Sequence, residues 1–245
     1  MKSATYGERV RFVRICLALV LLAIALTAGA ARGEDYPTLG LCTGNGVRLR
    51  SEPSTKDVSN ITGRVNDFDQ LILLGETSVD GETWYRVEHP TRRGAAWIFG
   101  KYVEPYRGDA AGTPAHDMAI QVRMAFGLTP EKARALLGKP KKETKRKFHF
   151  DPANADYLEV ILEYPAFRLR YLQGRLRHVE VSGGKASFGE IRVGDRMEKV
   201  REALGVPSSE GNEGWSYEVT PIEELLFEER DGRVFRMTWD EFMDA

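Results

Sequence analysis

Two stretches of the sequence carry the same motif, and this repetition constrains the fold more than any other feature of the chain. Residues 127–140 and 194–207 share Gly, Glu, Lys, Arg, Leu, Gly and Pro, and every match is offset by the same 67 residues. Seven identities in one fixed register predict that the C-terminal half is built from one unit used twice.

Each copy of the motif predicts a short helix with a defined start and stop. In the first copy Thr129 is a favourable N-cap, and Pro130 suits the first helical turn. Gly138 ends the helix and Pro140 prevents its continuation. Strand-like runs follow at 148–150, 158–164, 167–172 and 176–181 in the first copy and at 215–219, 224–228 and 234–239 in the second. Because such a helix must cover one face of its sheet, we expect a duplicated α+β two-layer module, with repeats at 118–187 and 188–245.

The pattern Gly-x₅–₆-Val/Ala-x₃-Leu-Gly-x-Pro, followed by antiparallel strands, resembles two related families. These are the outer-membrane assembly lipoproteins of the SmpA/OmlA type and the tandem-repeat β-lactamase inhibitor proteins. The resemblance implies non-catalytic protein binding in the envelope or outside the cell. The chain departs from the first family because it lacks the lipoprotein cysteine.

Charge is distributed unevenly between the two copies. Residues 127–187 hold 13 basic and 7 acidic side chains, whereas residues 188–245 hold 7 and 15. We expect the basic run to form a patch for an anionic partner, such as lipid headgroups or wall polymers, and its members are Lys141, Lys142, Lys145, Arg146 and Lys147. The alternatives are that the two copies attract one another or that both runs are solvated faces.

Residues 41–106 are typical of a small all-β domain. Gly46 to Arg50 alternates apolar and charged side chains, and strand-favouring runs follow at 61–65 and 71–74. The Asp80-Gly81 pair predicts a hairpin turn before the run 83–87. Short strands with no helical period predict a closed or sandwiched β domain.

This region resembles the bacterial SH3-type (SH3b) domain. The resemblance rests on the segments Val47-Arg48-Leu49-Arg50-Ser51-Glu52-Pro53-Ser54, Trp84-Tyr85-Arg86-Val87, Ala96-Trp97-Ile98 and Lys101-Tyr102-Val103. The chain departs from the family pattern at Arg48, Glu52 and Ala96. The resemblance implies an SH3-like barrel with an aromatic-lined groove for a cell-wall peptide or other extended ligand, formed by Trp84, Tyr85, Trp97 and Tyr102. The alternative is that these aromatic side chains fill the barrel core.

The N-terminus predicts export. Basic residues precede an apolar run at 15–28, and Ala28-Gly29-Ala30 supplies small residues for cleavage. We therefore expect a signal peptide at 1–30, a short extension at 31–40 and a periplasmic or secreted protein; the alternative is an uncleaved membrane anchor. The Gly-rich segment 107–117 is expected to link the barrel to the repeats.

Composition excludes several classes of function. The chain has 35 Lys and Arg against 36 Asp and Glu, and the resulting net charge of −1 does not favour a partner with a nucleic-acid backbone. Two Cys and four His, without metal-ligand spacing, predict no zinc site and no cofactor. After removal of 1–30, Cys42 is the remaining cysteine, and no histidine lies in a local pattern that would activate its thiol.

These patterns together predict an exported, non-enzymatic envelope protein. Its barrel is expected to bind a cell-wall peptide or another extended ligand, and its C-terminal repeats are expected to contact an envelope protein, with no transmembrane helix after signal removal. The first alternative is a regulatory or inhibitory protein of a secreted enzyme. The second is a cysteine-dependent enzyme that uses Cys42.

Overall fold

Short antiparallel strands joined by tight turns form the region from Thr38 to Pro105. The computed structural model describes residues 36–106, 112–150, 155–211 and 214–242. The predicted signal peptide at 1–30, the first half of the predicted extension and residues 107–111 of the predicted linker lie outside the described residues.

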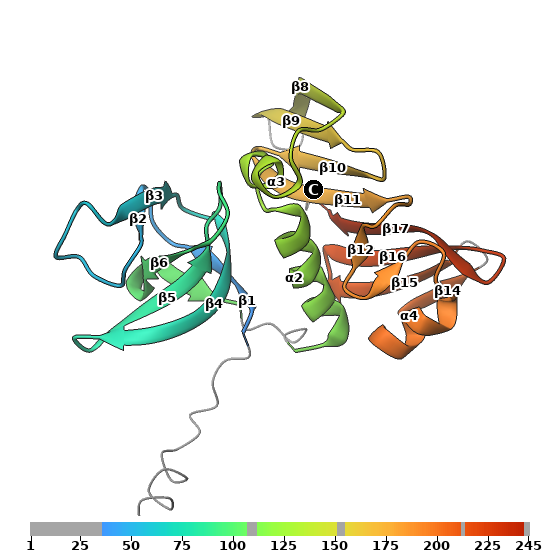
Figure 1. Cartoon of the computed structure of the whole chain (residues 1–245), viewed down its shortest axis with the longest axis horizontal. Coiled ribbons are helices and arrows are strands. Elements are labelled where there is room, and N and C mark those ends of the chain that lie inside the picture. The colour runs from blue at the N-terminus through green and yellow to red at the C-terminus, as the bar shows by residue number, and fades with distance from the viewer. Residues whose placement is uncertain (1–35, 107–111, 151–154, 212–213, 243–245) are drawn as a thin grey trace, which may run out of the picture. The chain divides into compact units, whose positions relative to one another are not determined.

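Seven strands make one sheet in the order β3-β2-β6-β5-β4-β1-β7 (Figure 1). They are β1 (Thr38–Cys42), β2 (Val47–Arg50), β3 (Ile61–Val65), β4 (Gln70–Val79), β5 (Glu82–Glu88), β6 (Ala95–Phe99) and β7 (Val103–Pro105), with the 3-10 turn η1 (Gly100–Tyr102) before β7. Asp80 and Gly81 both have positive φ, 55° and 83°, as the two central residues of a tight β4–β5 hairpin turn require. The strands enclose an apolar core that includes Leu49, Leu73 and Ile98.

A second sheet contains eight strands in the order β14-β15-β16-β17-β11-β10-β9-β8 (Figure 1). Its strands are β8 (Lys142–Phe150), β9 (Ala155–Glu163), β10 (Phe167–Leu172), β11 (Arg175–Val181), β14 (Ser209–Gly211), β15 (Gly214–Thr220), β16 (Glu223–Arg230) and β17 (Arg233–Glu241). The helices are α2 (Pro114–Phe126), α3 (Pro130–Leu137) and α4 (Met197–Leu204), and β12 (Ser187–Phe188) pairs with β13 (Ile191–Arg192).

This single sheet corrects the predicted fold class. The duplicated α+β two-layer module is wrong, because strands account for 51% of the structure and helices for 17%, in large sheets of seven and eight strands. The join is the β11–β17 ladder, in which Val179 lies opposite Trp239 and Val181 opposite Met237. Pairing there places the strands of both sequence segments in one sheet over one apolar core.

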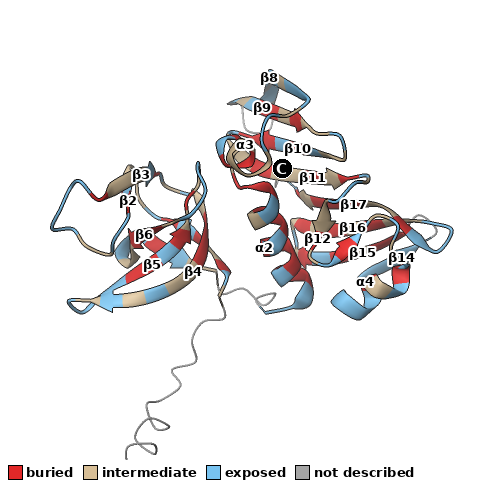
Figure 2. Ribbon diagram, viewed as in Figure 1, coloured by how far each residue is buried: buried red, intermediate tan, exposed pale blue. Residues whose placement is uncertain are grey.

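Helix α2 is an element that the sequence patterns did not predict. Thr113 caps it by accepting a hydrogen bond from the His116 amide, and Pro114 opens its first turn. The helix starts inside the predicted linker and contributes Met118, Val122 and Phe126 to the core of the eight-stranded sheet. Figure 2 shows the buried residues that run along α2.

Helix α3 and the loop before it contact the β5–β6 turn. The buried Lys132 ammonium lies 2.9 Å from Glu88 Oε1 and donates to the Arg92 carbonyl at 2.9 Å. Thr129 Oγ1 donates to the Pro90 carbonyl at 2.6 Å. Gly127 turns the chain between α2 and α3 at φ 83°, where an added Cβ would lie 2.8 Å from the Ala133 amide nitrogen. These contacts hold the β5–β6 turn against the helices.

Candidate ligand-binding face of the barrel

Alternation along β5 and β6 separates the barrel's aromatic side chains into two groups. Tyr85 points inward and is 8% exposed, in the same core cluster as Val87 and Ile98. Because successive side chains of a strand point to opposite faces, Trp84 and Trp97 lie on the outer face. The outer face is therefore where aromatic rings can meet a ligand.

Three aromatic rings lie in contact along this outer face. Trp84 is opposite Phe99 in the β5–β6 ladder, and their ring centroids are 5.2 Å apart. Phe99 in turn lies 6.2 Å from the Tyr102 ring in an edge-to-face arrangement. Trp84 is only 3% exposed, whereas Tyr102 is 37% exposed. The three rings, which we call the aromatic row, thus pass from the buried indole of Trp84 to the solvent-exposed phenol of Tyr102.

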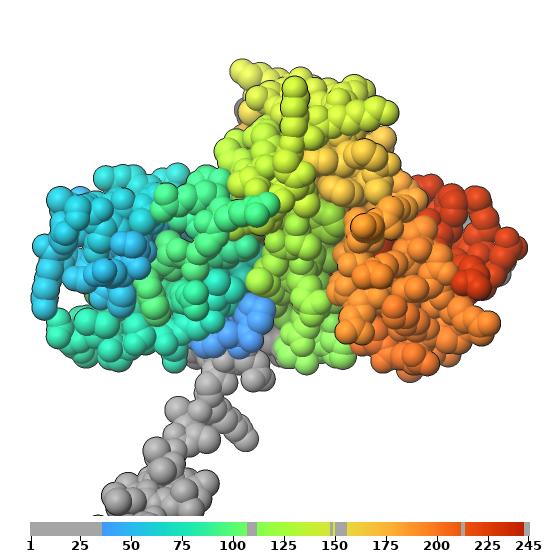
Figure 3. Space-filling model, in the orientation of Figure 1, coloured from blue at the N-terminus to red at the C-terminus, as the bar shows by residue number. Residues whose placement is uncertain are grey.

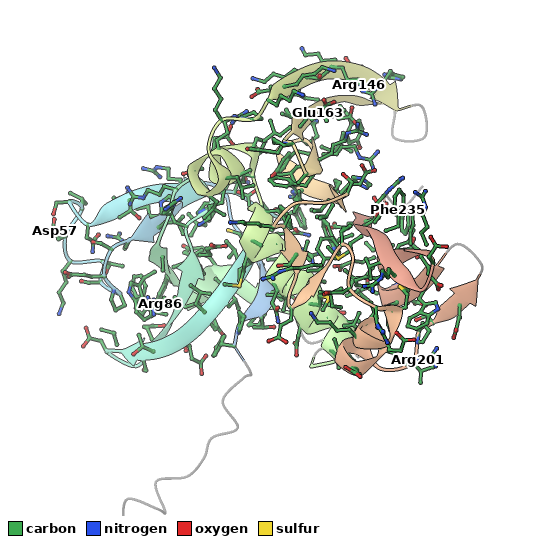
Figure 4. All side chains as sticks on the ribbon, turned by 45° about the vertical axis from the view of Figure 1, so that its right-hand side comes forward. Asp57, Arg86, Arg146, Glu163, Arg201 and Phe235 are labelled. Carbon is green, nitrogen blue, oxygen red and sulfur yellow. The ribbon has the colours of Figure 1, made fainter. Side chains whose placement is uncertain are left out.

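Trp97 extends the same face toward β2. It lies opposite Arg86 of β5 and Arg50 of β2 in the two neighbouring ladders, and Figure 4 shows Arg86 on the barrel. Trp97 is half-buried, so part of its ring remains accessible. An accessible indole beside the exposed Arg86 side chain offers both apolar contact area and hydrogen-bond donors.

The buried Arg50 guanidinium fixes the loop that borders this face. Its Nη1 donates to the Asp57 carbonyl at 2.9 Å and to Asn60 Oδ1 at 2.6 Å. Asn60 Nδ2 donates to the Ser54 carbonyl at 3.0 Å, and the Ser51 amide donates to the Asn60 carbonyl at 2.8 Å. Hydrogen bonds from the Ser59 amide and hydroxyl lower the pKa of the Asp57 carboxyl. The loop is therefore held from within by its own polar groups.

A hollow of about 150 Å³ lies between this loop and the β4–β5 turn. Its floor is formed by Trp84 and Phe99 and its walls by Pro53, Ser54, Thr55, Lys56, Val79, Asp80 and Glu82. In Figure 3 the surface is hollowed between these two segments. Ligand pockets for whole small molecules usually measure about 300–1,000 Å³, so this hollow suits one side chain of a longer ligand.

One ion pair crosses the mouth of the hollow. Lys56 Nζ lies 3.7 Å from Asp80 Oδ2, and the two side chains are 85% and 76% exposed. An exposed pair of this kind contributes at most about 1 kcal/mol, so the two side chains can separate at little cost. Entry to the hollow therefore needs no rearrangement of the barrel.

The predicted aromatic residues do not all reach this face. Trp84, Trp97 and Tyr102 lie on it, whereas Tyr85 belongs to the barrel core. Phe99 and Arg50 are functional candidates that the sequence reasoning missed. The alternation Ala95 to Phe99 contained the signal for Phe99, because every second residue of that run shares the face of Trp97.

The predicted basic patch lies on an edge strand. Lys142, Lys145, Arg146 and Lys147 belong to β8, the last strand of the eight-stranded sheet, and Lys141 immediately precedes it. Figure 4 shows Arg146 and Glu163 on this outer hairpin.

Most of the patch is already compensated by acidic neighbours. Lys142 pairs with Glu163 at 3.7 Å, Lys145 pairs with Glu143 at 3.2 Å, and Arg146 pairs with Glu159. Lysines also protect an exposed sheet edge from pairing with another chain. Binding to an anionic partner stays a prediction for this strand.

The Cys42 thiol is buried in the barrel core. It donates to the Gly44 carbonyl at 3.3 Å, and burial raises its pKa. A reactive cysteine needs an accessible thiolate with a lowered pKa, so this environment does not favour a nucleophile. Within the described ranges, no group of three or more His, Cys, Asp or Glu side chains is arranged to hold a metal ion. No helix among the described residues is long and apolar enough to span a bilayer.

Comparison with known proteins identifies the barrel. Residues 45–104 match the family model of the bacterial SH3 domain, which confirms the SH3b part of the predicted resemblance. Neither a curated protein nor a solved structure matches the chain. The resemblance of the C-terminal half to outer-membrane assembly lipoproteins and β-lactamase inhibitor proteins is therefore not confirmed. Bacterial SH3 domains are generally binding modules, and a role in binding the cell wall or peptidoglycan is consistent with the match.

Proposed function

We propose that this protein is an exported, non-catalytic cell-envelope protein whose barrel binds a cell-wall peptide or a similar extended ligand. The observation that carries the proposal is the aromatic face of the barrel, which comprises Trp84, Trp97, Phe99 and Tyr102 beside a hollow of about 150 Å³. Export is supported by the basic and apolar pattern of residues 1–30.

The ligand chemistry follows from the shape of this face. The hollow accepts one side chain, while Trp97 and Tyr102 offer further contact area outside it. A ligand that uses both must be longer than a single residue and must lie along the barrel surface. Aromatic rings and arginine are the groups that most often dominate binding energy at such interfaces. An extended peptide therefore fits better than a compact small molecule.

The test is co-sedimentation of the purified protein with purified wall sacculi. Wild type is expected to sediment with sacculi, and Trp97→Ala is expected to weaken binding about tenfold or more, because interface tryptophans are frequent hot spots. Phe242→Ala is the matched control, since Phe242 is an aromatic side chain 48% exposed outside the barrel. Thermal unfolding of each variant checks that the fold is retained.

Two results would contradict the proposal. One is a wild-type protein that stays in the supernatant with every sacculus preparation. The other is a Trp97→Ala protein that binds as tightly as the Phe242→Ala control. The proposed contact between the C-terminal sheet and an envelope protein is tested separately, by capturing envelope extract on wild type and on Trp97→Ala and asking whether one defined protein is retained by both.

A further inference from the structure

A second cavity lies away from the aromatic face. It measures about 610 Å³ and is bordered by β1, β7, α2 and the β15–β16 turn. Leu39, Leu41, Tyr106 and Ile222 make much of its wall apolar. Its volume falls in the range of about 300–1,000 Å³ that small-molecule sites occupy.

A buried ionic network forms the polar part of this cavity. Arg123 Nη1 lies 2.6 Å from Glu223 Oε1, and Arg123 Nη2 lies 3.4 Å from Glu241 Oε2. Trp239 Nε1 donates to the same Glu223 Oε1 at 2.6 Å, and the Arg123 guanidinium lies 4.4 Å from the Trp239 ring centroid. Arg177 pairs with the other oxygen of Glu241. Each guanidinium in the network is therefore held by a carboxylate.

Three side chains that line the cavity, His116, Arg123 and Glu223, keep a polar atom without a hydrogen-bond partner among the described residues. His116 is 2% exposed and lines the cavity, yet neither of its ring nitrogens has a hydrogen-bond partner within the described part of the chain. Its ring stacks on Tyr106 with centroids 5.2 Å apart, which fixes its orientation. Glu223 Oε2 accepts no hydrogen bond among the described residues, and Arg123 Nε is buried without a partner there. Buried polar atoms are rarely left unpaired, so the His116 ring nitrogens point to a ligand that pairs with them.

The charge balance of the cavity is acidic. Glu104, Glu223 and Glu241 line it, against Arg123 alone among the basic residues. Arg177 also pairs with Glu241, so both buried carboxylates have an arginine partner and the exposed Glu104 has none among the described residues. Burial lowers the pKa of His116, so its imidazole is neutral at pH 7 and adds no positive charge. A cation is therefore the complementary ligand group.

We propose that this cavity binds an apolar molecule that carries a primary ammonium group, such as the amino-terminal residue of an apolar peptide. The ammonium donates to Glu223 Oε2 and to the unprotonated His116 nitrogen, and the apolar body packs against the Leu39, Leu41 and Ile222 wall. Glu104 at the rim attracts the positive charge. The site is separate from the aromatic face, and its failure would leave the sacculus experiment unaffected.

The first test titrates the full chain with three matched probes and measures the change in its amide chemical shifts. L-leucinamide carries the ammonium and an apolar side chain, N-acetyl-L-leucinamide lacks only the charge, and n-hexylamine carries the charge without a peptide group. L-leucinamide is expected to give saturable shifts at Leu41, Tyr106 and Ile222 and to bind at least tenfold more tightly than the acetylated probe. Saturable binding of n-hexylamine alone would support the ammonium site and exclude a peptide amino terminus as its ligand.

Variants at the rim separate a built site from weak surface attraction. Glu104→Gln removes an exposed carboxylate that has no ion pair among the described residues, and it is expected to weaken L-leucinamide binding about two- to fivefold. Glu76→Gln, an exposed carboxylate elsewhere on the barrel, is the control and should change nothing. Leu41→Trp narrows the mouth at a position that is already exposed, and it is expected to weaken binding at least tenfold.

Three results would overturn the proposal. The first is equal binding of the acetylated and free probes, and the second is the absence of any saturable shift with both amines. The third is an unchanged affinity in both Glu104→Gln and Leu41→Trp. The probe comparison needs no variant, so a variant that fails to fold leaves the test intact.

Discussion

The aromatic face of the barrel and the basic strand β8 differ in how much structure supports them. Both were conspicuous in the sequence, one as a set of aromatic residues and the other as a run of lysines and arginine. At the aromatic face, Arg50 holds a loop that walls a defined hollow. On β8, the charged side chains are exposed and three of them already pair with acidic neighbours.

This difference shows that composition alone does not make a site. A binding face needs groups held in place before the ligand arrives, because ordering them during binding costs affinity. The aromatic face meets that condition through the ladder contacts of β5 and β6 and the Arg50 hydrogen bonds. Strand β8 provides charge without a fixed concave surface, which is sufficient to protect a sheet edge.

The largest expected effect comes from removing the support of the aromatic face. Arg50→Ala leaves Asn60 Oδ1 and the Asp57 carbonyl without their donor and should lower the free energy of unfolding by about 2–3 kcal/mol. Sacculus binding should fall more than tenfold, because the loop wall is released. Urea unfolding and co-sedimentation measure the two effects. Arg48→Ala, an exposed arginine on the same strand, is the control and should stay within about 0.5 kcal/mol of wild type.

A smaller effect is expected at the open end of the aromatic row. Tyr102→Ala removes a side chain that is partly exposed and contacts Phe99 at its edge, so sacculus binding should fall about threefold. Tyr102→Phe keeps the ring and should bind within about twofold of wild type. Equal losses in both variants would mean that the hydroxyl, not the ring, makes the contact.

Acid should lower the free energy of unfolding through two buried histidines. Burial lowers the pKa of His89 and of His116 below the ordinary value of about 6.5, so the unfolded chain binds more protons below that pH. Their contribution to stability is fully present above about pH 6.5 and is lost as the pH falls toward their folded pKa values. The urea midpoint should therefore fall between about pH 7 and about pH 5.5. His89→Gln should reduce this dependence, and an unchanged slope in that variant would contradict the assignment.

The smallest effect is expected on strand β8. Lys141 and Lys147 form no ion pair among the described residues, so the double variant Lys141→Ala/Lys147→Ala removes two charges without disturbing a partner. Because screening weakens exposed charges at physiological salt, sacculus binding should change by less than about twofold. A loss larger than that of Tyr102→Ala would reverse the comparison and make β8 the main wall contact.

Local sequence patterns predicted the barrel better than the C-terminal half. Asp80-Gly81 fixed a hairpin through backbone conformations that few residue pairs adopt, and the short alternating runs identified the strands. The β11–β17 ladder could not be predicted in the same way. It pairs residues far apart in the chain, and the alternation along Arg175–Val181 does not specify its partner strand.

The site residues show the same difference between what local patterns predict and what depends on distant contacts. Trp84, Trp97 and Tyr102 were predicted from a family pattern, and strand alternation would have removed Tyr85 and added Phe99. Arg50 and Arg123 were missed because their roles depend on burial beside distant acceptors, which a local pattern does not contain. His116 and Arg123 also interrupt the apolar stripe of α2, and this concealed the helix itself.

The most direct test of the account is a chemical-shift titration of the full chain with muropeptides released from purified sacculi. We expect saturable shifts at the Trp97 indole N–H and at the amides of Phe99, Tyr102 and residues 54–56, with little change at 141–147. Shifts confined to 141–147, or no saturable shift anywhere on the barrel, would contradict it.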